Sequence, residues 1–341
     1  MGLPVRPSFA TWHAGGYANT AAPRVADPSR LQSLAGRTMG TTWSLRFDNP
    51  SMQPHYAVEA AVTDALDRVI AQMSTWEPAS DISRYNAAKA GTRHALPVAF
   101  AEVLACALHW AKASGGAVDP TVGALVALWG FGAQAGTAPD HCPPSPTALD
   151  AARARTGWER LEFDAVGKQI TQPGGVQLDL SGIAKGFAVD HVADALMATG
   201  LHDFLVEVGG ELRGAGRRPD GQPWRVRLDT PIDTLAPVVL TDLAIATSGD
   251  RWHAHEHAGH RWSHTIDPRS GEPTSHGLTS VTVLHPLCMH ADALATAFTV
   301  LGPIAGPDFA ARHDVAALFV CRDGDAGHRA IATPAWTARA S

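Results

Sequence analysis

Short strand-like segments, arranged in hairpin-like runs, constrain the fold of this 341-residue chain most. Several of them lie between Phe204 and Thr247, and others follow near the C-terminus. Segments with helical periodicity interrupt these runs only occasionally. A doubly wound protein would instead alternate strands and helices regularly along the chain. The pattern therefore predicts an α+β fold.

Apolar residues at helical spacing predict helices over 56–72, 100–113, 182–199 and 290–301, with a further helix over 305–312. Strand-like segments are predicted over 37–47, 161–171, 175–180, 204–208, 224–228, 238–240, 243–247, 278–284 and 315–320. The Pro-rich stretch 136–147 is predicted to be a surface loop or an insertion.

Charge and cysteine usage argue against several classes of protein. The net charge of −6 disfavours nonspecific binding of nucleic acid, which requires a basic surface. The sequence has no apolar run of about 20 residues that would span a membrane, and residues 1–30 contain no secretory apolar core. The four cysteines form no C-x-x-C pair, which favours reduced thiols over a zinc ribbon. We expect a flexible leader at 1–30 and a cytoplasmic location, or a periplasmic one if the true N-terminus lies upstream.

Four polar clusters interrupt the apolar pattern, whereas the phosphate-loop, G-x-G-x-x-G, G-x-S-x-G and H-E-x-x-H motifs do not occur. The first cluster, 73–86, ends a predicted helix in a polar turn that carries Trp76. The second, 115–123, places Asp119 directly before Pro-Thr. Taken alone, each is explained by helix capping or a turn at least as well as by ligand binding.

The third cluster, 178–190, contains the segment DLSGIAKG at 179–186, where a predicted strand ends and a helix begins through small residues. The free N–H groups of a helix N-terminus favour phosphate binding. Lys185, one of only four lysines in the chain, lies in the predicted first turn. A cation there opposes the helix dipole, so a role in phosphate binding is the favoured interpretation.

The fourth cluster combines SHTIDP at 263–268 with ADALAT at 291–296. Asp292 and Thr296 are four residues apart, so a helix presents both side-chain oxygens on the same side. A carboxylate with a hydroxyl suits Mg²⁺, which prefers hard oxygen ligands. An Asp cap followed by a buried Thr bonded to a backbone carbonyl explains the same pair equally well.

Taken together, these segments resemble the ApbE family of FAD:protein FMN transferases. The resemblance runs from Gly36 to about Val320, over most of the chain. Its motifs here are MGT at 39–41, MSTW at 73–76, DPT at 119–121, DLSGIAKG at 179–186, VGGE at 208–211, TSGD at 247–250, SHTIDP and ADALAT. So many segments in the family's order are more specific than any one motif.

The resemblance implies an ApbE-like, T-fold-related architecture of mixed, largely antiparallel sheets packed with helices, in a single domain over 31–341. It places the FAD site in a cleft between two subdomains. It implies Mg²⁺-dependent transfer of FMN from FAD, the substrate, to a Thr or Ser hydroxyl of an acceptor flavoprotein, with release of AMP. The residues that would line the FAD site are Met39, Trp76, Ala117, Val118, Asp119, Asp179, Lys185 and Ile266. Those that would hold Mg²⁺ are Asp292, Thr296 and the carbonyl of Gly182.

His264 is the candidate general base, because a neutral imidazole can accept a proton near pH 7 and SHTIDP flanks the metal-binding helix. Lys185 and Asp292 complete the predicted catalytic set. An FAD pyrophosphatase that gives free FMN and AMP, or a non-catalytic flavin-binding protein, is the alternative function. The histidines between 253 and 260 are interpreted as an exposed loop between two strands, with a second metal site or an acceptor-docking loop as the alternative.

Overall fold

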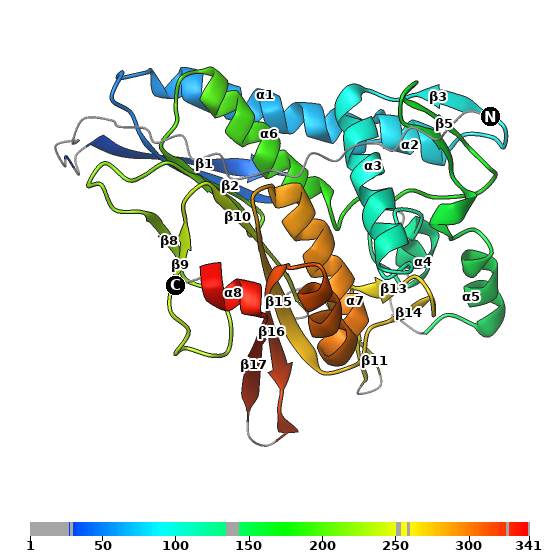
Figure 1. Cartoon of the computed structure of the whole chain (residues 1–341). Coiled ribbons are helices and arrows are strands. Elements are labelled where there is room, and N and C mark those ends of the chain that lie inside the picture. Colours follow the sequence, from blue (N-terminus) through cyan, green and yellow to red (C-terminus); the bar gives the residue numbers. More distant parts are fainter. Residues whose placement is uncertain are drawn as a thin grey trace, which may run out of the picture.

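The structure is a computed structural model that describes Asp27 and residues 30–133, 143–249, 254–257, 260–324 and 327–339. An eight-stranded sheet forms its centre, in the order β1-β2-β6-β7-β10-β15-β16-β17 (Figure 1). Its strands are β1 (Leu31–Thr38), β2 (Thr41–Asp48), β6 (Phe204–Val208), β7 (Glu211–Ala215), β10 (Leu243–Gly249), β15 (Leu278–His285), β16 (Ala316–Arg322) and β17 (His328–Ala332). All neighbouring strands in this sheet are antiparallel, which confirms the predicted α+β fold.

The eight-stranded sheet is covered on both faces, and the alternation of side chains along each strand separates two cores. Phe204, Val206 and Val208 of β6 belong to the larger core, whereas Leu205 packs against the smaller one. The larger core is covered by α1 (His55–Met73), α6 (Ala184–Ala198) and α7 (Cys288–Arg312). The smaller core receives β8 (Trp224–Val226), β9 (Val238–Leu240) and α8 (Pro334–Arg339).

A second group of elements lies beside the main sheet, on the right in Figure 1. Its helices are α2 (Asp81–Asn86), α3 (Val98–Ala113), α4 (Gly123–Leu128) and α5 (Pro146–Arg153). Its strands are β3 (Arg93–Ala95), β4 (Glu162–Asp164), β5 (Gln169–Thr171), β13 (Ile266–Asp267) and β14 (Glu272–Pro273). The helix α3 packs against α1 and α7, and its apolar face joins the larger core, so the two groups share buried side chains.

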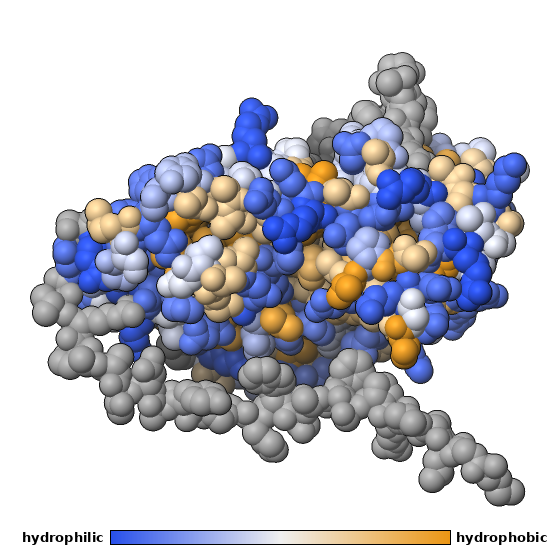
Figure 2. Space-filling view, turned by 90° about the horizontal axis from the view of Figure 1, so that it is seen from above, coloured by the Kyte–Doolittle hydropathy of each residue, from blue (hydrophilic) through white to orange (hydrophobic). Residues whose placement is uncertain are grey.

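The three long predicted helices are confirmed as α1, α3 and α6, within two residues at each end. The two helices predicted near the C-terminus form the single run α7, which is interrupted by the non-helical backbone of Gly302. By length and hydropathy α7 could cross a membrane, but 67% of its most apolar window is buried inside the protein. It is therefore a core helix of this fold. The outer face seen from above carries scattered apolar residues among mostly hydrophilic ones (Figure 2).

Two predictions of local structure were wrong. The strand predicted over 37–47 is a hairpin, because Met39 and Gly40 have positive φ values of 48° and 72° and form the turn between β1 and β2. The strand predicted over 175–180 is an extended segment whose recorded pairing is an isolated bridge between Val122 and Gln177. Most of the loop predicted over 136–147 lies outside the described residues, and α5 begins at Pro146.

Candidate active site

A cleft of about 870 Å³ lies where the main sheet meets the second group of elements. This volume is within the range of small-molecule and cofactor sites. All residues predicted for FAD binding, metal binding and catalysis line it: Met39, Trp76, Ala117, Val118, Asp119, Asp179, Gly182, Lys185, His264, Ile266, Asp292 and Thr296. They come from segments far apart in the sequence, so tertiary folding brings the predicted set to one place.

The hairpin turn and the end of α1 supply one side of the cleft. Met39 occupies the left-handed region at φ 48°, an uncommon conformation for a residue with a long side chain, and it packs against the larger core. Trp76 follows α1, and 73% of its surface is exposed. An exposed indole beside a cleft presents a free ring face, the geometry needed to stack on a flat ligand.

Asp119 is buried, and both its carboxylate oxygens are used within the fold. Its Oδ1 accepts hydrogen bonds from the N–H (2.8 Å) and the hydroxyl (2.6 Å) of Thr121, and its Oδ2 accepts one from the N–H of Trp158 (3.0 Å). Burial raises the pKa of Asp119, and these hydrogen bonds oppose the rise. The side chain therefore fixes the turn that brings Ala117 and Val118 to the cleft, as the turn interpretation of this cluster predicts.

The segment from Asp179 to Gly182 forms a tight approach to α7. Asp179 Oδ1 accepts a hydrogen bond from the N–H of Ser181 (2.8 Å), and the Thr296 hydroxyl donates to the carbonyl of Gly182 (3.4 Å). A Cβ atom at Gly182 would lie 2.8 Å from Thr296 Oγ1. Glycine is therefore required there for the Gly182 carbonyl and the Thr296 hydroxyl to come together.

The first turn of α6 packs directly on α7 at Gly186. The N–H of Gly186 donates to Asp292 Oδ2 at 2.9 Å, and Asp292 is buried. A Cβ atom at Gly186 would overlap the carbonyl oxygen of Cys288 and lie 2.7 Å from Asp292 Cβ. Burial raises the pKa of Asp292, and the nearby Lys185 ammonium and the Gly186 N–H oppose the rise.

Lys185 lies in the first turn of α6 and forms an ion pair with Glu211 of β7, with 2.6 Å between Nζ and Oε1. The Glu211 side chain is only 3% exposed, whereas that of Lys185 is 35% exposed and reaches the cleft. Burial raises the pKa of Glu211 above its usual range; the Lys185 charge opposes this rise, and Asp292 adds to it. Burial lowers the pKa of Lys185, but the carboxylates of Glu211 and Asp292 outweigh this and raise it.

Glu211 was not among the predicted site residues, although it belongs to the VGGE motif. The signal in the sequence is an acidic residue directly after two glycines. Its Oε2 atom is buried and has no hydrogen-bond partner among the described residues. Lys185 therefore provides the cation that compensates this buried carboxylate.

His264 lines the cleft, and its ring lies at 70° to the ring of Phe131 in a T-shaped arrangement, with 6.4 Å between the ring centroids. Upstream of it, β11 (Ala254–His257) and β12 (His260–Ser263) form a hairpin. The histidine run is therefore largely strand rather than a loop between strands, which corrects the prediction. The side chains of residues 251–261 lie outside the described part of the structure, so both roles considered for them stay predictions.

The donor set predicted for Mg²⁺ fits such an ion in its chemistry. Asp292 offers a carboxylate, Thr296 a hydroxyl, and Gly182 a backbone carbonyl, all of them hard oxygens on the cleft wall. The described residues contain no group of three His, Cys, Asp or Glu side chains arranged for a metal. A single carboxylate is nevertheless sufficient for Mg²⁺, which commonly keeps water and substrate phosphate as its other ligands.

Comparison with known proteins agrees with this arrangement. The model of the ApbE family matches residues 39–319. This chain belongs to the ApbE family. It is 37% identical to the FAD:protein FMN transferase of Vibrio cholerae over 305 residues, covering 87% of this chain and 90% of that protein. It is 36% identical to the protein of the same name from Haemophilus influenzae, over 86% of this chain and 87% of that one.

The fold agrees with the solved structures of ApbE proteins as well. The apo form of the flavinyl transferase ApbE from Pseudomonas stutzeri superimposes with a TM-score of 0.83 at 38% identity. The match covers 91% of this chain and 96% of that one. The ApbE-like architecture predicted from the sequence is thereby confirmed.

Proposed function

We propose that this protein transfers FMN from FAD to a Thr or Ser hydroxyl of an acceptor flavoprotein, with Mg²⁺ bound and with release of AMP. The observation that carries the proposal is the meeting of Lys185, Asp292, Thr296 and the Gly182 carbonyl in one cleft of about 870 Å³. A cation beside hard oxygen ligands is the arrangement that a pyrophosphate requires. The names of the relatives support the same reaction.

Each group on the cleft wall has a task in this reaction. The Trp76 ring stacks on the flavin, and the Lys185 ammonium, kept in place by Glu211, binds pyrophosphate oxygens. Asp292, Thr296 and the Gly182 carbonyl would hold the Mg²⁺. A bound Mg²⁺ would neutralise negative charge that develops on the phosphate oxygens.

The acceptor hydroxyl needs a base, and His264 is the proposed one. Its imidazole takes the proton as the hydroxyl oxygen forms a bond to the FMN phosphorus. The bond between that phosphorus and the bridging oxygen breaks, and AMP leaves with the electron pair. If water replaced the acceptor hydroxyl, the same residues would hydrolyse FAD to FMN and AMP.

The proposal is tested by incubating the protein with FAD, Mg²⁺ and a candidate acceptor, followed by in-gel flavin fluorescence. Fluorescence in the acceptor band is the expected result. Free FMN and AMP without labelled acceptor would make the protein a pyrophosphatase, and unchanged FAD would make it a flavin-binding protein.

Two variants test the assigned residues. Asp292→Asn should lower transfer at least about 100-fold, the loss typical when transition-state charge stabilisation is removed. His264→Ala should lower it by about 100-fold or more, as expected for a general base. Asp308→Asn, an exposed change on the same helix as Asp292, is the matched control and should retain full activity. Full activity in either site variant would refute the role assigned to that residue.

A further inference from the structure

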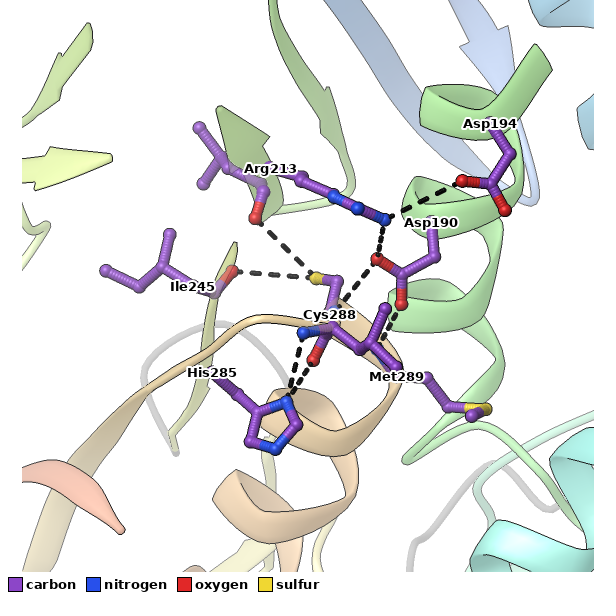
Figure 3. Close-up of polar contacts among 9 residues, drawn as sticks. Asp190, Asp194, Arg213, Ile245, His285, Cys288 and Met289 are labelled. Carbon is purple, nitrogen blue, oxygen red and sulfur yellow. Dashed lines mark hydrogen bonds and ion pairs between the residues drawn. The ribbon is translucent and has the colours of Figure 1, made fainter. Parts of the chain in front are cut away.

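Asp190 lies at the junction of α6, α7 and β7, on the side of α6 that faces the sheet (Figure 3). It is 6% exposed. Its Oδ1 accepts a hydrogen bond from the N–H of Cys288 (3.0 Å), and its Oδ2 accepts one from the N–H of Met289 (2.9 Å). Arg213 of β7 donates to Oδ1 from 2.9 Å. One buried carboxylate of α6 therefore joins the N-terminus of α7 to a strand of the main sheet.

The α7 helix has no cap of its own that could replace this contact. Its N-cap residue, Leu287, provides no side-chain hydrogen bond. The first N–H groups of a helix need acceptors, and a carboxylate there also interacts favourably with the helix dipole. Burial raises the pKa of Asp190, while the two N–H groups and Arg213 oppose the rise. The cap is supplied by a neighbouring helix, so it fixes one helix against the other.

Cys288 holds the same turn against the sheet. Its thiol lies 3.7 Å from the carbonyl oxygen of Leu212 in β7 and 3.8 Å from that of Ile245 in β10 (Figure 3). The N–H of Leu287 donates to Nδ1 of His285 at 3.0 Å. The start of α7 is thus restrained by contacts from α6, β7 and β10 together.

The three elements joined at Asp190, α6, α7 and β7, also carry charged residues that line the cleft. Lys185 and Gly186 lie on α6 about one turn before Asp190. Asp292 lies four residues after Cys288 on α7, about 6 Å along the helix. Glu211 lies two residues before Arg213 on β7, so the two side chains share one face of the strand. The Lys185–Glu211 and Asp190–Arg213 pairs are therefore two successive links between α6 and β7.

We propose that Asp190 is a positioning residue, which sets the axial position of α7 so that Asp292 and Thr296 meet the Gly182 carbonyl as metal ligands. This inference rests on the proposed Mg²⁺ site. The tight packing at Gly186 leaves little tolerance for a shift of α7, because Cys288 and Asp292 both contact that glycine. Groups that orient metal ligands contribute to affinity although they do not touch the metal.

The test is calorimetric titration of Mg²⁺ alone into the full-length protein. Asp190→Asn keeps the shape of the side chain, but it removes the charge and turns one acceptor into a donor. It should raise the Kd for Mg²⁺ about 10-fold or more, as changes behind metal ligands do.

Asp48→Asn is the matched control. Asp48 is also a buried carboxylate paired with an arginine, Arg30, at 2.6 Å, but it lies at the end of β2 away from the cleft. The strand places it roughly 23 Å from the hairpin turn that lines the cleft. The Asp48→Asn variant should lose stability as Asp190→Asn does, but its Kd for Mg²⁺ should equal that of the unaltered protein.

The outcomes separate a positioning role from a merely structural one. An unchanged Kd in Asp190→Asn, or an equal rise in Asp48→Asn, would overturn the inference. If Asp190→Asn does not fold, Asp190→Glu serves instead, because it keeps the charge but displaces both acceptor oxygens by one methylene group. It should also raise the Kd for Mg²⁺, and an unchanged Kd there would overturn the inference equally. Failure of the unaltered protein to bind Mg²⁺ would refute the proposed metal site itself, and the role of Asp190 in it.

Discussion

Removal of the Lys185 ammonium should destabilise the protein through Glu211 rather than through the lost lysine contacts. In Lys185→Met, the Glu211 side chain stays buried at 3% exposure, with its Oε2 atom already lacking a partner among the described residues. Breaking a fully buried ion pair costs about 3–5 kcal/mol. Because 35% of the Lys185 side chain is exposed, solvent screens this pair. We therefore expect a loss of about 2 kcal/mol, between the values for exposed and buried pairs.

A double-mutant cycle measures the coupling. Lys185→Met, Glu211→Gln and the double variant are unfolded in urea at pH 7, and the free energies of unfolding are compared. The double variant should recover most of the stability lost in Lys185→Met, because it removes both charges and leaves side chains of similar volume. Its transferase activity should stay as low as that of Lys185→Met, because the cation for the pyrophosphate is still missing.

Two results would refute this reasoning. If the losses of stability in the two single variants sum to the loss in the double variant within about 0.5 kcal/mol, the two residues are not coupled. The ion pair then does not hold Lys185 in place. If the double variant regains activity together with stability, the lysine has no electrostatic task in the reaction. Measuring stability and activity on the same samples separates the two roles of Lys185.

Two further predictions concern the packing and the pH dependence of the fold. Gly186→Ala should destabilise the protein by at least about 2 kcal/mol, since its Cβ would overlap the Cys288 carbonyl; thermal unfolding measures this, and an unchanged melting temperature would contradict the close packing of α6 on α7. Burial, with the adjacent His290, lowers the pKa of His285 from 6.5 to about 4. The unfolded chain therefore takes up a proton at His285 at a higher pH than the folded protein does. The resulting loss of stability is absent above pH 6.5 and grows as the pH falls toward 4, to at most about 3 kcal/mol. In urea unfolding, the free energy of unfolding of His285→Gln should vary less with pH over this range than that of the unaltered protein. An equal variation would exclude His285 as the source of the pH dependence.

Local sequence patterns were sufficient to predict those helices and strands whose periodicity is visible within a single segment. The helical spacing of Val58, Val62, Leu66 and Val69 predicted α1, and all four side chains are buried in the larger core. A strand such as β6 was predicted to its boundaries, because alternation along five residues requires no distant partner to be recognised. The hairpin at Met39–Gly40 was missed, because a residue other than glycine or asparagine rarely occupies the first position of such a turn.

The candidate site shows the same division. The i, i+4 spacing of Asp292 and Thr296 and the position of Lys185 in a first turn were both readable from the sequence, as were the segments shared with the ApbE family. The contact between Asp292 and the Gly186 N–H joins residues 106 positions apart, and that between Asp190 and Cys288 joins residues 98 apart. No local pattern encodes such a pairing, because it depends on how two helices pack on one sheet.

The sequence by itself determined the α+β fold, the long helices and the membership of the polar segments in one family pattern. Only the tertiary structure decided which charges meet. It placed Glu211 of β7 against Lys185 of α6 and made Asp190 the cap of another helix. The physical reason is that helix and strand periodicity arise from neighbours in the chain, whereas the partner of a buried charge is fixed by packing between elements that are distant in sequence.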